Sequence, residues 1–146
     1  MFGQAKFEAM NAHVNSMLER RRLLISAHRG SGGGSIAVNT ELGIKAAFLS
    51  GADLVEIDVS SSVDGEFYCF HDGCEPELLG IEANLQTLTA EEIDRLSYTW
   101  VDRPGRRARV EHLLPLLRGF KDTDTLFNID RSWWRWPNML LALDGL

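Results

Sequence analysis

The chain has 146 residues, of which 45% are hydrophobic and 25% are charged, and its formal net charge is −6. This length predicts one domain with its own core, or part of a larger domain. The net negative charge argues against general binding to nucleic acid or to an anionic membrane, because both require a cationic surface. Any site for a phosphate group is therefore expected to be local.

The first predicted element is an amphipathic helix within residues 1–22, which we separate from one domain at 23–146. Its apolar residues recur at three- and four-residue spacing: Phe7, Met10, Val14 and Met17. We expect this helix to pack against, or to cover one end of, the structure that follows. The segment has no apolar run as long as a signal peptide or a membrane span, so we expect a cytoplasmic protein without stable membrane insertion. The cysteines Cys69 and Cys74 form no disulfide framework, which also favours a reducing compartment.

Strand-like and helix-like segments alternate over the rest of the chain. The predicted strands are apolar runs that stop at polar residues: Leu23–Ala27, Leu54–Val59 and Leu126–Ile129. The predicted helices begin at cap-like residues or carry an apolar face: one from Thr40 to about Gly51, one opening at Thr89, and one over Val110–Phe120, where Pro115 is a possible kink. This order predicts an α/β sheet or barrel with its functional groups at the C-terminal ends of the strands. A complete eight-unit barrel needs about 250 residues, so we expect only part of one.

A hairpin is predicted after Leu54–Val59, because Asp64-Gly65 between strand-like residues is a strong signal for a tight turn. A two-residue turn would pair Val63 with Glu66. Counting outward then places His71 opposite Asp58, with Glu56 on the same face and diagonal to His71. A bulge would shift this register by one residue.

Two carboxylates alternate along the most apolar strand of this half, Glu56 and Asp58. Alternating acidic residues are commonly just a solvated face, but burial of two like charges without a partner would be prohibitive. A cation between them removes that cost. Oxygen ligands favour Mg²⁺ or Ca²⁺ over zinc.

Two histidines lie close in sequence to groups that suit a phosphate. His28 by itself would more often be an ordinary hydrogen-bonded histidine, but Arg29 and the glycines that follow supply a guanidinium and accessible backbone N–H groups. His71 has the same ordinary alternative, weakened by its predicted place beside the two carboxylates. Together these residues suit metal-assisted cleavage of a phosphate ester. We assign no role to His13 or His112.

The order of short motifs from Ala27 to about Asp130 resembles that of glycerophosphodiester phosphodiesterases. The motifs are His-Arg-Gly, Asn-Thr, Gly-Ala-Asp, Glu-x-Asp-Val, Asp-Gly and His-Asp. The resemblance implies the N-terminal portion of a TIM-type barrel, which hydrolyses glycerophosphodiesters to glycerol phosphate and an alcohol with a divalent metal. It implies an acid–base pair of His28 and His71, a phosphate contact from Arg29, and three metal ligands: Glu56, Asp58 and Asp130. Which histidine is the acid, and whether water or a neighbouring substrate hydroxyl attacks, stay open.

The chain departs from the family pattern at three positions. Val38 stands where the family commonly has glutamate, Asp130 where glutamate is usual, and Arg131 where lysine is often found. The sequence ends at Leu146, soon after three tryptophans that could line a pocket or form an uncovered surface: Trp133, Trp134 and Trp136. Two alternatives therefore remain: a related phospholipase acting on a lipid phosphodiester, and a non-catalytic remnant that binds phosphate or a partner. An incomplete barrel edge also predicts possible self-association.

Overall fold

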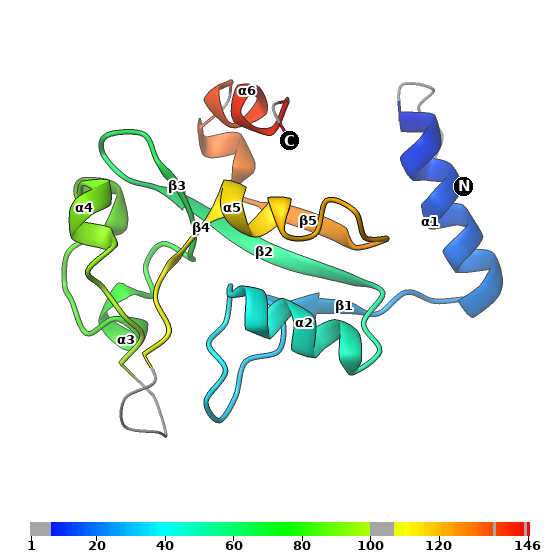
Figure 1. Cartoon of the computed structure of the whole chain (residues 1–146), viewed down its shortest axis with the longest axis horizontal. Coiled ribbons are helices and arrows are strands. Elements are labelled where there is room, and N and C mark those ends of the chain that lie inside the picture. The colour runs from blue at the N-terminus through cyan, green and yellow to red at the C-terminus, as the bar shows by residue number, and fades with distance from the viewer. Residues whose placement is uncertain (1–6, 100–106, 136, 145) are drawn as a thin grey trace.

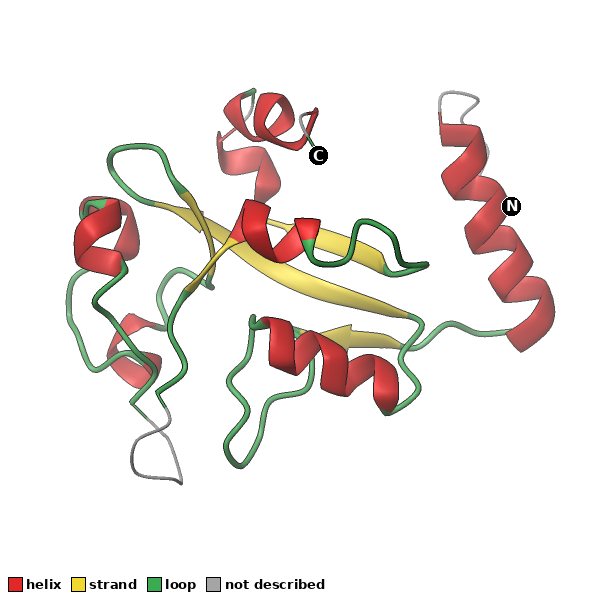
Figure 2. Cartoon of the chain, viewed as in Figure 1, coloured by secondary structure: helices red, strands yellow, loops and turns green. Residues whose placement is uncertain are grey.

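The computed structural model describes residues 7–99, 107–135, 137–144 and 146. Within them the chain forms a five-stranded mixed sheet with short helices around it (Figures 1 and 2). The strands are β1 (Ser26–His28), β2 (Leu54–Ser61), β3 (Phe67–Cys69), β4 (Glu111–His112) and β5 (Leu126–Asp130). The helices are α1 (Glu8–Arg21), α2 (Glu41–Leu49), α3 (Glu75–Leu78), η2 (Leu85–Thr87), α4 (Ala90–Ile93), α5 (Leu113–Arg118), η3 (Ser132–Arg135) and α6 (Asn138–Asp144).

The long strand β2 organises the sheet because it pairs in two ways. Its first five residues pair in parallel with β5, and three of them also pair in parallel with β1. Since both strands pair with the same part of β2, they lie on its two edges (Figure 1). The last three residues of β2 pair antiparallel with β3, which in turn pairs with β4. The parallel part therefore brings the C-terminal ends of three strands to one place.

The main hydrophobic core lies between one face of β2 and two helices. It combines alternate residues of β2 with the apolar faces of α2 and α5: Val55, Ile57, Val59, Ile44, Ala47, Leu113, Leu116 and Leu117. Side chains alternate along a strand, so Glu56 and Asp58 project from the opposite face of β2. A second cluster forms around Tyr68 and Phe70 of the antiparallel part. The cores hold the sheet while leaving the two carboxylates on a separate face.

Most predicted elements are confirmed, and two need correction. The strand predicted at Leu23–Ala27 is parallel as expected but begins only at Ser26, and Leu23 and Ile25 are 61% and 52% exposed. Strand β2 begins at Leu54, which pairs with Ser26. Residues 23–25 therefore have no residue of β2 opposite them. The helix predicted over Val110–Phe120 is wrong in its first part, where β4 forms instead. Helix α5 then begins at Leu113, which places Pro115 in the first turn, where a missing N–H causes no kink.

The helix starts follow the capping residues read from the sequence. The Thr40 hydroxyl accepts a hydrogen bond from the Gly43 N–H at 3.2 Å, and α2 ends before Ser50 as predicted. At Thr89 both halves of a capping box are present, with Glu92 as the partner. Helix α4 nevertheless has only four residues and ends at Ile93, with Asp94 at the C-cap position.

The hairpin between β2 and β3 is confirmed, but its predicted register is wrong by one residue. Val59 pairs with Cys69, and the Phe70 N–H donates to the Asp58 carbonyl, so Phe70 rather than His71 lies opposite Asp58. The turn has three residues: the Ser62 N–H donates to the Glu66 carbonyl at 2.8 Å, and the Glu66 N–H donates to the Ser62 hydroxyl. Gly65 takes a φ of +100°, which an L side chain rarely adopts. The extra residue is the bulge that shifts the pairing.

Helix α1 forms where it was predicted, but it does not cover the rest of the structure. None of its residues is buried, and Met10 on its predicted apolar face is 52% exposed. In Figure 1 it projects from one end of the sheet. An ion pair of 2.9 Å between Arg21 and Asp53 connects its last turn to the start of β2. The expected packing of its apolar face is therefore not observed.

The C-terminal part of the described chain consists of η3 and α6 after β5 (Figure 2). Trp133 is 60% exposed, which agrees with the surface alternative rather than the pocket alternative for this residue. The side chain of Trp134, and all of Trp136, lie outside the described residues. No helix in the described ranges combines the length and the apolar character needed to cross a membrane.

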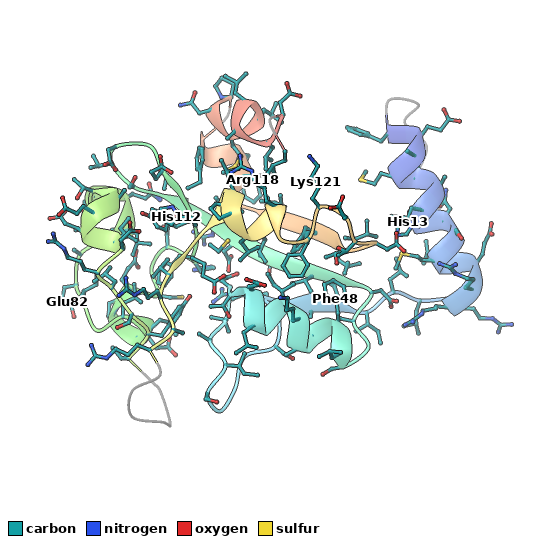
Figure 3. All side chains as sticks on the ribbon, viewed as in Figure 1. His13, Phe48, Glu82, His112, Arg118 and Lys121 are labelled. Atoms are coloured by element: carbon teal, nitrogen blue, oxygen red, sulfur yellow. The ribbon has the colours of Figure 1, made fainter. Side chains whose placement is uncertain are left out.

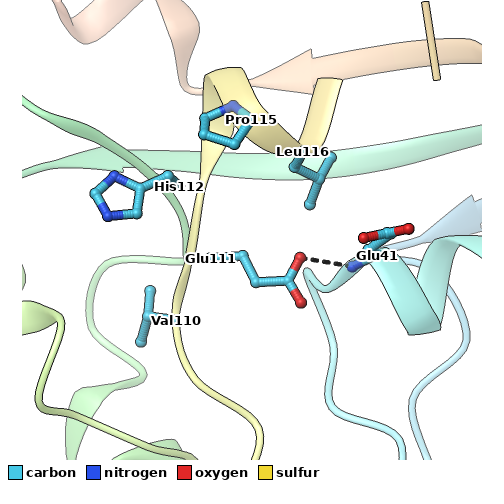
Figure 4. Close-up of a pocket in the computed structure, with 6 residues that line it drawn as sticks. All are labelled: Glu41, Val110, Glu111, His112, Pro115 and Leu116. Atoms are coloured by element: carbon cyan, nitrogen blue, oxygen red, sulfur yellow. Dashed lines mark hydrogen bonds between the residues drawn. The ribbon is translucent and has the colours of Figure 1, made fainter. Parts of the chain in front are cut away.

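Glu111 of β4 fixes the start of α2 from across the fold. Its Oε2 accepts a hydrogen bond of 2.8 Å from the Glu41 backbone N–H, at the edge of a pocket that Val110, Pro115 and Leu116 also line (Figure 4). Burial raises the pKa of Glu111 above its ordinary value of 4.5, and the Glu41 N–H opposes this only in part. Burial of the charged Glu111 carboxylate therefore lowers the free energy of unfolding. This cost depends on pH, because it applies only when the carboxyl group is ionised.

We expect Glu111→Gln to remove this pH dependence. A raised pKa means that the folded protein holds the proton more tightly than the unfolded chain does, so the contribution of Glu111 to the free energy of unfolding falls as pH rises above 4.5. Glutamine keeps an oxygen acceptor for the Glu41 N–H but carries no charge. Denaturant unfolding at about pH 4 and about pH 7 should show wild type losing stability relative to the variant. The exposed Glu82 (Figure 3) provides the control Glu82→Gln. A difference in the free energy of unfolding between wild type and Glu111→Gln that stays constant with pH would contradict the expectation.

Candidate active site

The predicted site residues gather at the C-terminal ends of the three parallel strands. The register places His28 of β1 beside Glu56 of β2, and Asp58 of β2 beside Asp130 of β5. Paired residues of neighbouring strands project from the same face, so these four side chains share the face opposite the main core. His71 reaches the same place from the segment after β3. The sheet topology thus assembles residues that lie up to about a hundred positions apart.

The three carboxylates form a compact cluster. Glu56, Asp58 and Asp130 each offer an oxygen atom, and these atoms lie within 4.8 Å of one another. Burial raises the pKa of Glu56 above its ordinary value, and the charges of Asp58 and Asp130 raise it further, whereas the Arg29 N–H and His28 act in the opposite direction. Like charges held this close are unfavourable unless a cation lies between them. The donor set is all oxygen, which suits a hard divalent cation.

Asp58 is the most tightly held member of this cluster. It is 1% exposed, and its Oδ2 accepts a hydrogen bond of 3.0 Å from Asn39 Nδ2 and lies 2.9 Å from Arg29 Nε. The Asp58 N–H in turn donates to Asn39 Oδ1 at 3.1 Å. Two donors thus lie against Oδ2, which leaves Oδ1, 4.0 Å from His71 Nε2, as the oxygen better placed for a cation.

Asn39 is a site residue whose role the sequence did not reveal. Its Asn-Thr motif was visible, but it indicates equally well the start of α2. In the structure Asn39 is 1% exposed, bonds both the side chain and the backbone of Asp58, and adopts a φ of +54°. Its N–H donates to the Arg29 carbonyl at 2.9 Å, which ties the loop after β1 to the start of α2.

Arg29 connects two of the carboxylates. Its backbone N–H donates to Glu56 Oε2 at 3.0 Å, while its side chain contacts Asp58. Arg29, Asn39 and Arg131 are three of the four non-glycine residues with positive φ among the described ones. Such conformations are costly for L residues and tend to occur where function constrains the backbone. The backbone is therefore most strained at the site.

The two candidate catalytic histidines flank the carboxylates in different surroundings. His28 Nε2 lies 3.9 Å from Glu56 Oε2, and its side chain is 74% exposed. His71 Nε2 lies 4.0 Å from Asp58 Oδ1, and its side chain is only 24% exposed. His13 projects from α1, outside the sheet (Figure 3). The His112 ring packs against that of Tyr68, with centroids 4.4 Å apart and ring planes tilted by 37°. Neither of the last two reaches the cluster by any contact that the structure shows.

His71 has partners that sequence reasoning did not predict. Arg131 Nη2 lies 3.0 Å from Nε2 and Cys74 Sγ lies 3.5 Å from Nδ1. Arg131 is held in turn by Asp72, 3.9 Å from its Nη1, and Asp72 accepts hydrogen bonds from Ser60 and Gln86. The position of Arg131 directly after β5 was visible in the sequence. Its contact with His71, sixty residues earlier, was not.

Comparison with known proteins provides the family. A model of the glycerophosphoryl diester phosphodiesterase family matches residues 28–137, which is most of the chain. The chain belongs to this family. A comparison with curated proteins gave no significant match.

Solved structures of glycerophosphodiester phosphodiesterases share this fold. One from Agrobacterium tumefaciens is 27% identical with a TM-score of 0.61, and it aligns with 73% of this chain and 45% of its own. An Oleispira antarctica phosphodiesterase in complex with the product sn-glycerol-3-phosphate is 25% identical with a TM-score of 0.63, over 73% of this chain and 43% of its own. One from Parabacteroides distasonis, 21% identical, supports the fold alone with a TM-score of 0.68, over 84% of this chain and 43% of its own.

These comparisons confirm the predicted fold class, an α/β chain that forms an incomplete TIM-type barrel. The chain spans less than half the length of the three solved structures. Val38 stands where the glycerophosphodiester phosphodiesterase family commonly has glutamate, and the structure shows how it is accommodated. Its side chain packs on the second hydrophobic cluster, and its carbonyl accepts a hydrogen bond from the Tyr98 hydroxyl at 3.0 Å. No carboxylate is therefore supplied from this position.

Proposed function

We propose that the protein hydrolyses glycerophosphodiesters to glycerol phosphate and an alcohol. The observation that carries the proposal is the convergence of His28, His71, Arg29 and three carboxylates at one end of the parallel strands, in a member of this family. The product found in the Oleispira antarctica structure supports a small-molecule substrate of this class.

We propose that Glu56, Asp58 and Asp130 hold a divalent cation, Mg²⁺ or Ca²⁺. The fit rests on the geometry: three carboxylate oxygens within 4.8 Å of one another, with the pKa of Glu56 raised by burial and by its acidic neighbours. A bound cation would supply positive charge to a phosphodiester and so favour attack at phosphorus. The all-oxygen ligand set supports Mg²⁺ or Ca²⁺ rather than a softer metal.

The protein's own residues supply charge and proton transfer. Arg29 carries a permanent positive charge beside Asp58, where its guanidinium can bind phosphate oxygens. The two imidazoles are the groups that can take a proton from the attacking oxygen and give one to the departing alkoxide. Because an alkoxide is a poor leaving group, protonation of it is an essential part of the reaction. Arg131, next to His71, adds a second guanidinium to the site.

A second function, phosphate binding without turnover, is favoured by one observation. The His28 side chain is 74% exposed, whereas a general acid or base must be held within hydrogen-bond reach of the reacting oxygen. The side chain of Arg29, the proposed phosphate-binding group, is by contrast only 19% exposed. The two functions therefore differ in what they require of His28.

We also infer the broader setting of the protein. Cys69 and Cys74 are both free, which supports the proposed cytoplasmic location. We infer that residues 23–146 form one domain and that the segment 1–22, which contains α1, lies outside it, because α1 has no buried residue. Among the described strands, β1 and β5 each pair on one side only, and this supports the proposal that the domain can self-associate through these edges.

The test is an assay of the purified chain with glycerophosphocholine, in which release of glycerol phosphate is followed with and without Mg²⁺ or Ca²⁺. We expect metal-dependent release that His28→Ala abolishes. Equal release by both proteins, or none by either with metal present, would overturn the hydrolase proposal for this chain. Calorimetric titration with glycerol phosphate then decides the second function, because binding without release is its expected result.

A further inference from the structure

Cys74 contacts both the candidate phosphate-binding arginine and a candidate catalytic histidine. Its Sγ lies 3.5 Å from His71 Nδ1, and Arg29 Nη1 donates to the same sulfur at 3.8 Å. The residue is half-buried, and neither its type nor its position indicated a function in the sequence. The sulfur therefore lies between two groups of the site that come from different strands.

The contacts of His71 determine its tautomer. Arg131 Nη2 lies 3.0 Å from Nε2, and a guanidinium can only donate hydrogen bonds. Nε2 is therefore the acceptor in the neutral imidazole, and the proton is on Nδ1. The Nδ1–H faces Cys74 Sγ, which can accept it as a weak acceptor. This tautomer keeps the lone pair at Nε2, the nitrogen that faces Asp58 across 4.0 Å.

The turn that carries Cys74 is held in place by its own contacts. The Cys74 N–H donates to the His71 carbonyl at 3.2 Å, and Gly73 between them has a φ of +91°. The Gly73 N–H donates to Glu75 Oε2 at 2.6 Å, and the other oxygen of Glu75 accepts from the Leu85 N–H at 2.9 Å. Glu75 is 2% exposed. A buried carboxylate thus fixes the turn that brings the sulfur to the imidazole.

We propose that Cys74 is a positioning residue of the site: its sulfur accepts the Nδ1–H of His71 and, together with Arg131 at Nε2, holds the tautomer with the proton on Nδ1. The same sulfur also accepts a hydrogen bond from Arg29 Nη1, and this contact orients the guanidinium that we propose binds phosphate. The effect on reaction rate rests on the proposed function, but the effect on the tautomer does not.

The tautomer can be measured without substrate. We would label the histidines with ¹⁵N, assign His71 from the signals lost in His71→Gln, and record long-range ¹H–¹⁵N spectra of the metal-free protein at about pH 8, where imidazoles are neutral. Wild type should show the proton on Nδ1. In Cys74→Ala and Cys74→Val a mixture with the Nε2–H form should appear, whereas Cys74→Ser, which keeps an acceptor, should retain the wild-type tautomer. Cys69→Ala is the control for loss of a thiol, because Cys69 is fully buried in the core and distant in role from the site.

Two results would overturn the proposal: a proton on Nε2 of His71 in wild type, or an unchanged tautomer in both Cys74→Ala and Cys74→Val. A proton on Nε2 in wild type would overturn the proposal even if a variant fails to fold, whereas the part played by Cys74 beside Arg131 is decided by the variants. In the glycerophosphocholine assay we expect Cys74→Ala to lower kcat by about three- to tenfold, the effect of losing one hydrogen bond, with partial recovery in Cys74→Ser. An active wild type whose kcat is unaffected by Cys74→Ala would also overturn the positioning role. An inactive wild type with the expected tautomer would contradict only the proposed function.

Discussion

Replacement of His71 by glutamine is expected to lower the rate of metal-dependent glycerol phosphate release by about 10²- to 10⁴-fold, the usual effect of losing a general acid or base. Glutamine is polar and of similar reach, so it can keep a hydrogen bond with Arg131 while losing the ability to transfer a proton at Nε2. The measurement is steady-state release from glycerophosphocholine at saturating metal. Because the chemical step is affected, kcat should fall far more than KM changes.

His13→Gln is the matched control for His71→Gln, since His13 lies on α1, outside the sheet (Figure 3). It should leave the rate within about twofold of wild type. Unfolding curves of the two variants will show whether a loss of folded protein, rather than a loss of proton transfer, causes the lower rate. If His71→Gln retained more than half of the wild-type rate, His71 would have no part in proton transfer.

Binding of Mg²⁺ or Ca²⁺ is expected to stabilise the fold, by about 2.7 kcal/mol when the free cation is at a hundred times its dissociation constant. The cation relieves the repulsion among Glu56, Asp58 and Asp130, whose oxygens lie within 4.8 Å of one another. Asp130→Asn should behave in opposite ways in the two states. It should raise the free energy of unfolding of the metal-free protein by removing a like charge, and it should lose most of the stabilisation by the cation.

Thermal unfolding with chelator and with increasing cation measures both effects for this second prediction. Asp124→Asn is the control, because Asp124 is an exposed carboxylate just before β5. It should respond to the cation as wild type does. Equal stabilisation of wild type and Asp130→Asn would place the cation elsewhere, and no stabilisation of wild type at millimolar cation would argue against a site in this cluster.

The hairpin shows where sequence reasoning reaches its limit. Asp64-Gly65 correctly indicated a turn, because few residue pairs suit its backbone. The choice between a two-residue and a three-residue turn depended on the Ser62 hydroxyl and on the φ of Gly65, which local composition does not reveal. His71 is therefore one residue away from its predicted partner, yet it still approaches Asp58 because the segment after β3 folds back through Gly73 and Cys74.

Helix α1 shows a different limit. The spacing of its apolar residues predicted the helix correctly, since that spacing follows from local geometry. The same spacing does not say which surface, if any, receives the apolar face. In the described structure no residue of the helix is buried, so the predicted packing of its apolar face is wrong.

The sequence by itself determined the alternation of strands and helices, the parallel strand ends, and the identity of the charged residues that follow those ends. These features depend on periodicities of two and 3.6 residues, which act over short stretches of chain. Only the tertiary structure decided that Asn39 contacts Asp58 and that Arg131 and Cys74 contact His71. It also decided that one oxygen of each of the three carboxylates lies within 4.8 Å of the others. These contacts join residues on separate strands and loops. They arise from the pairing of β2 with both neighbours and from loop residues in positive-φ conformations, neither of which has a local sequence signal.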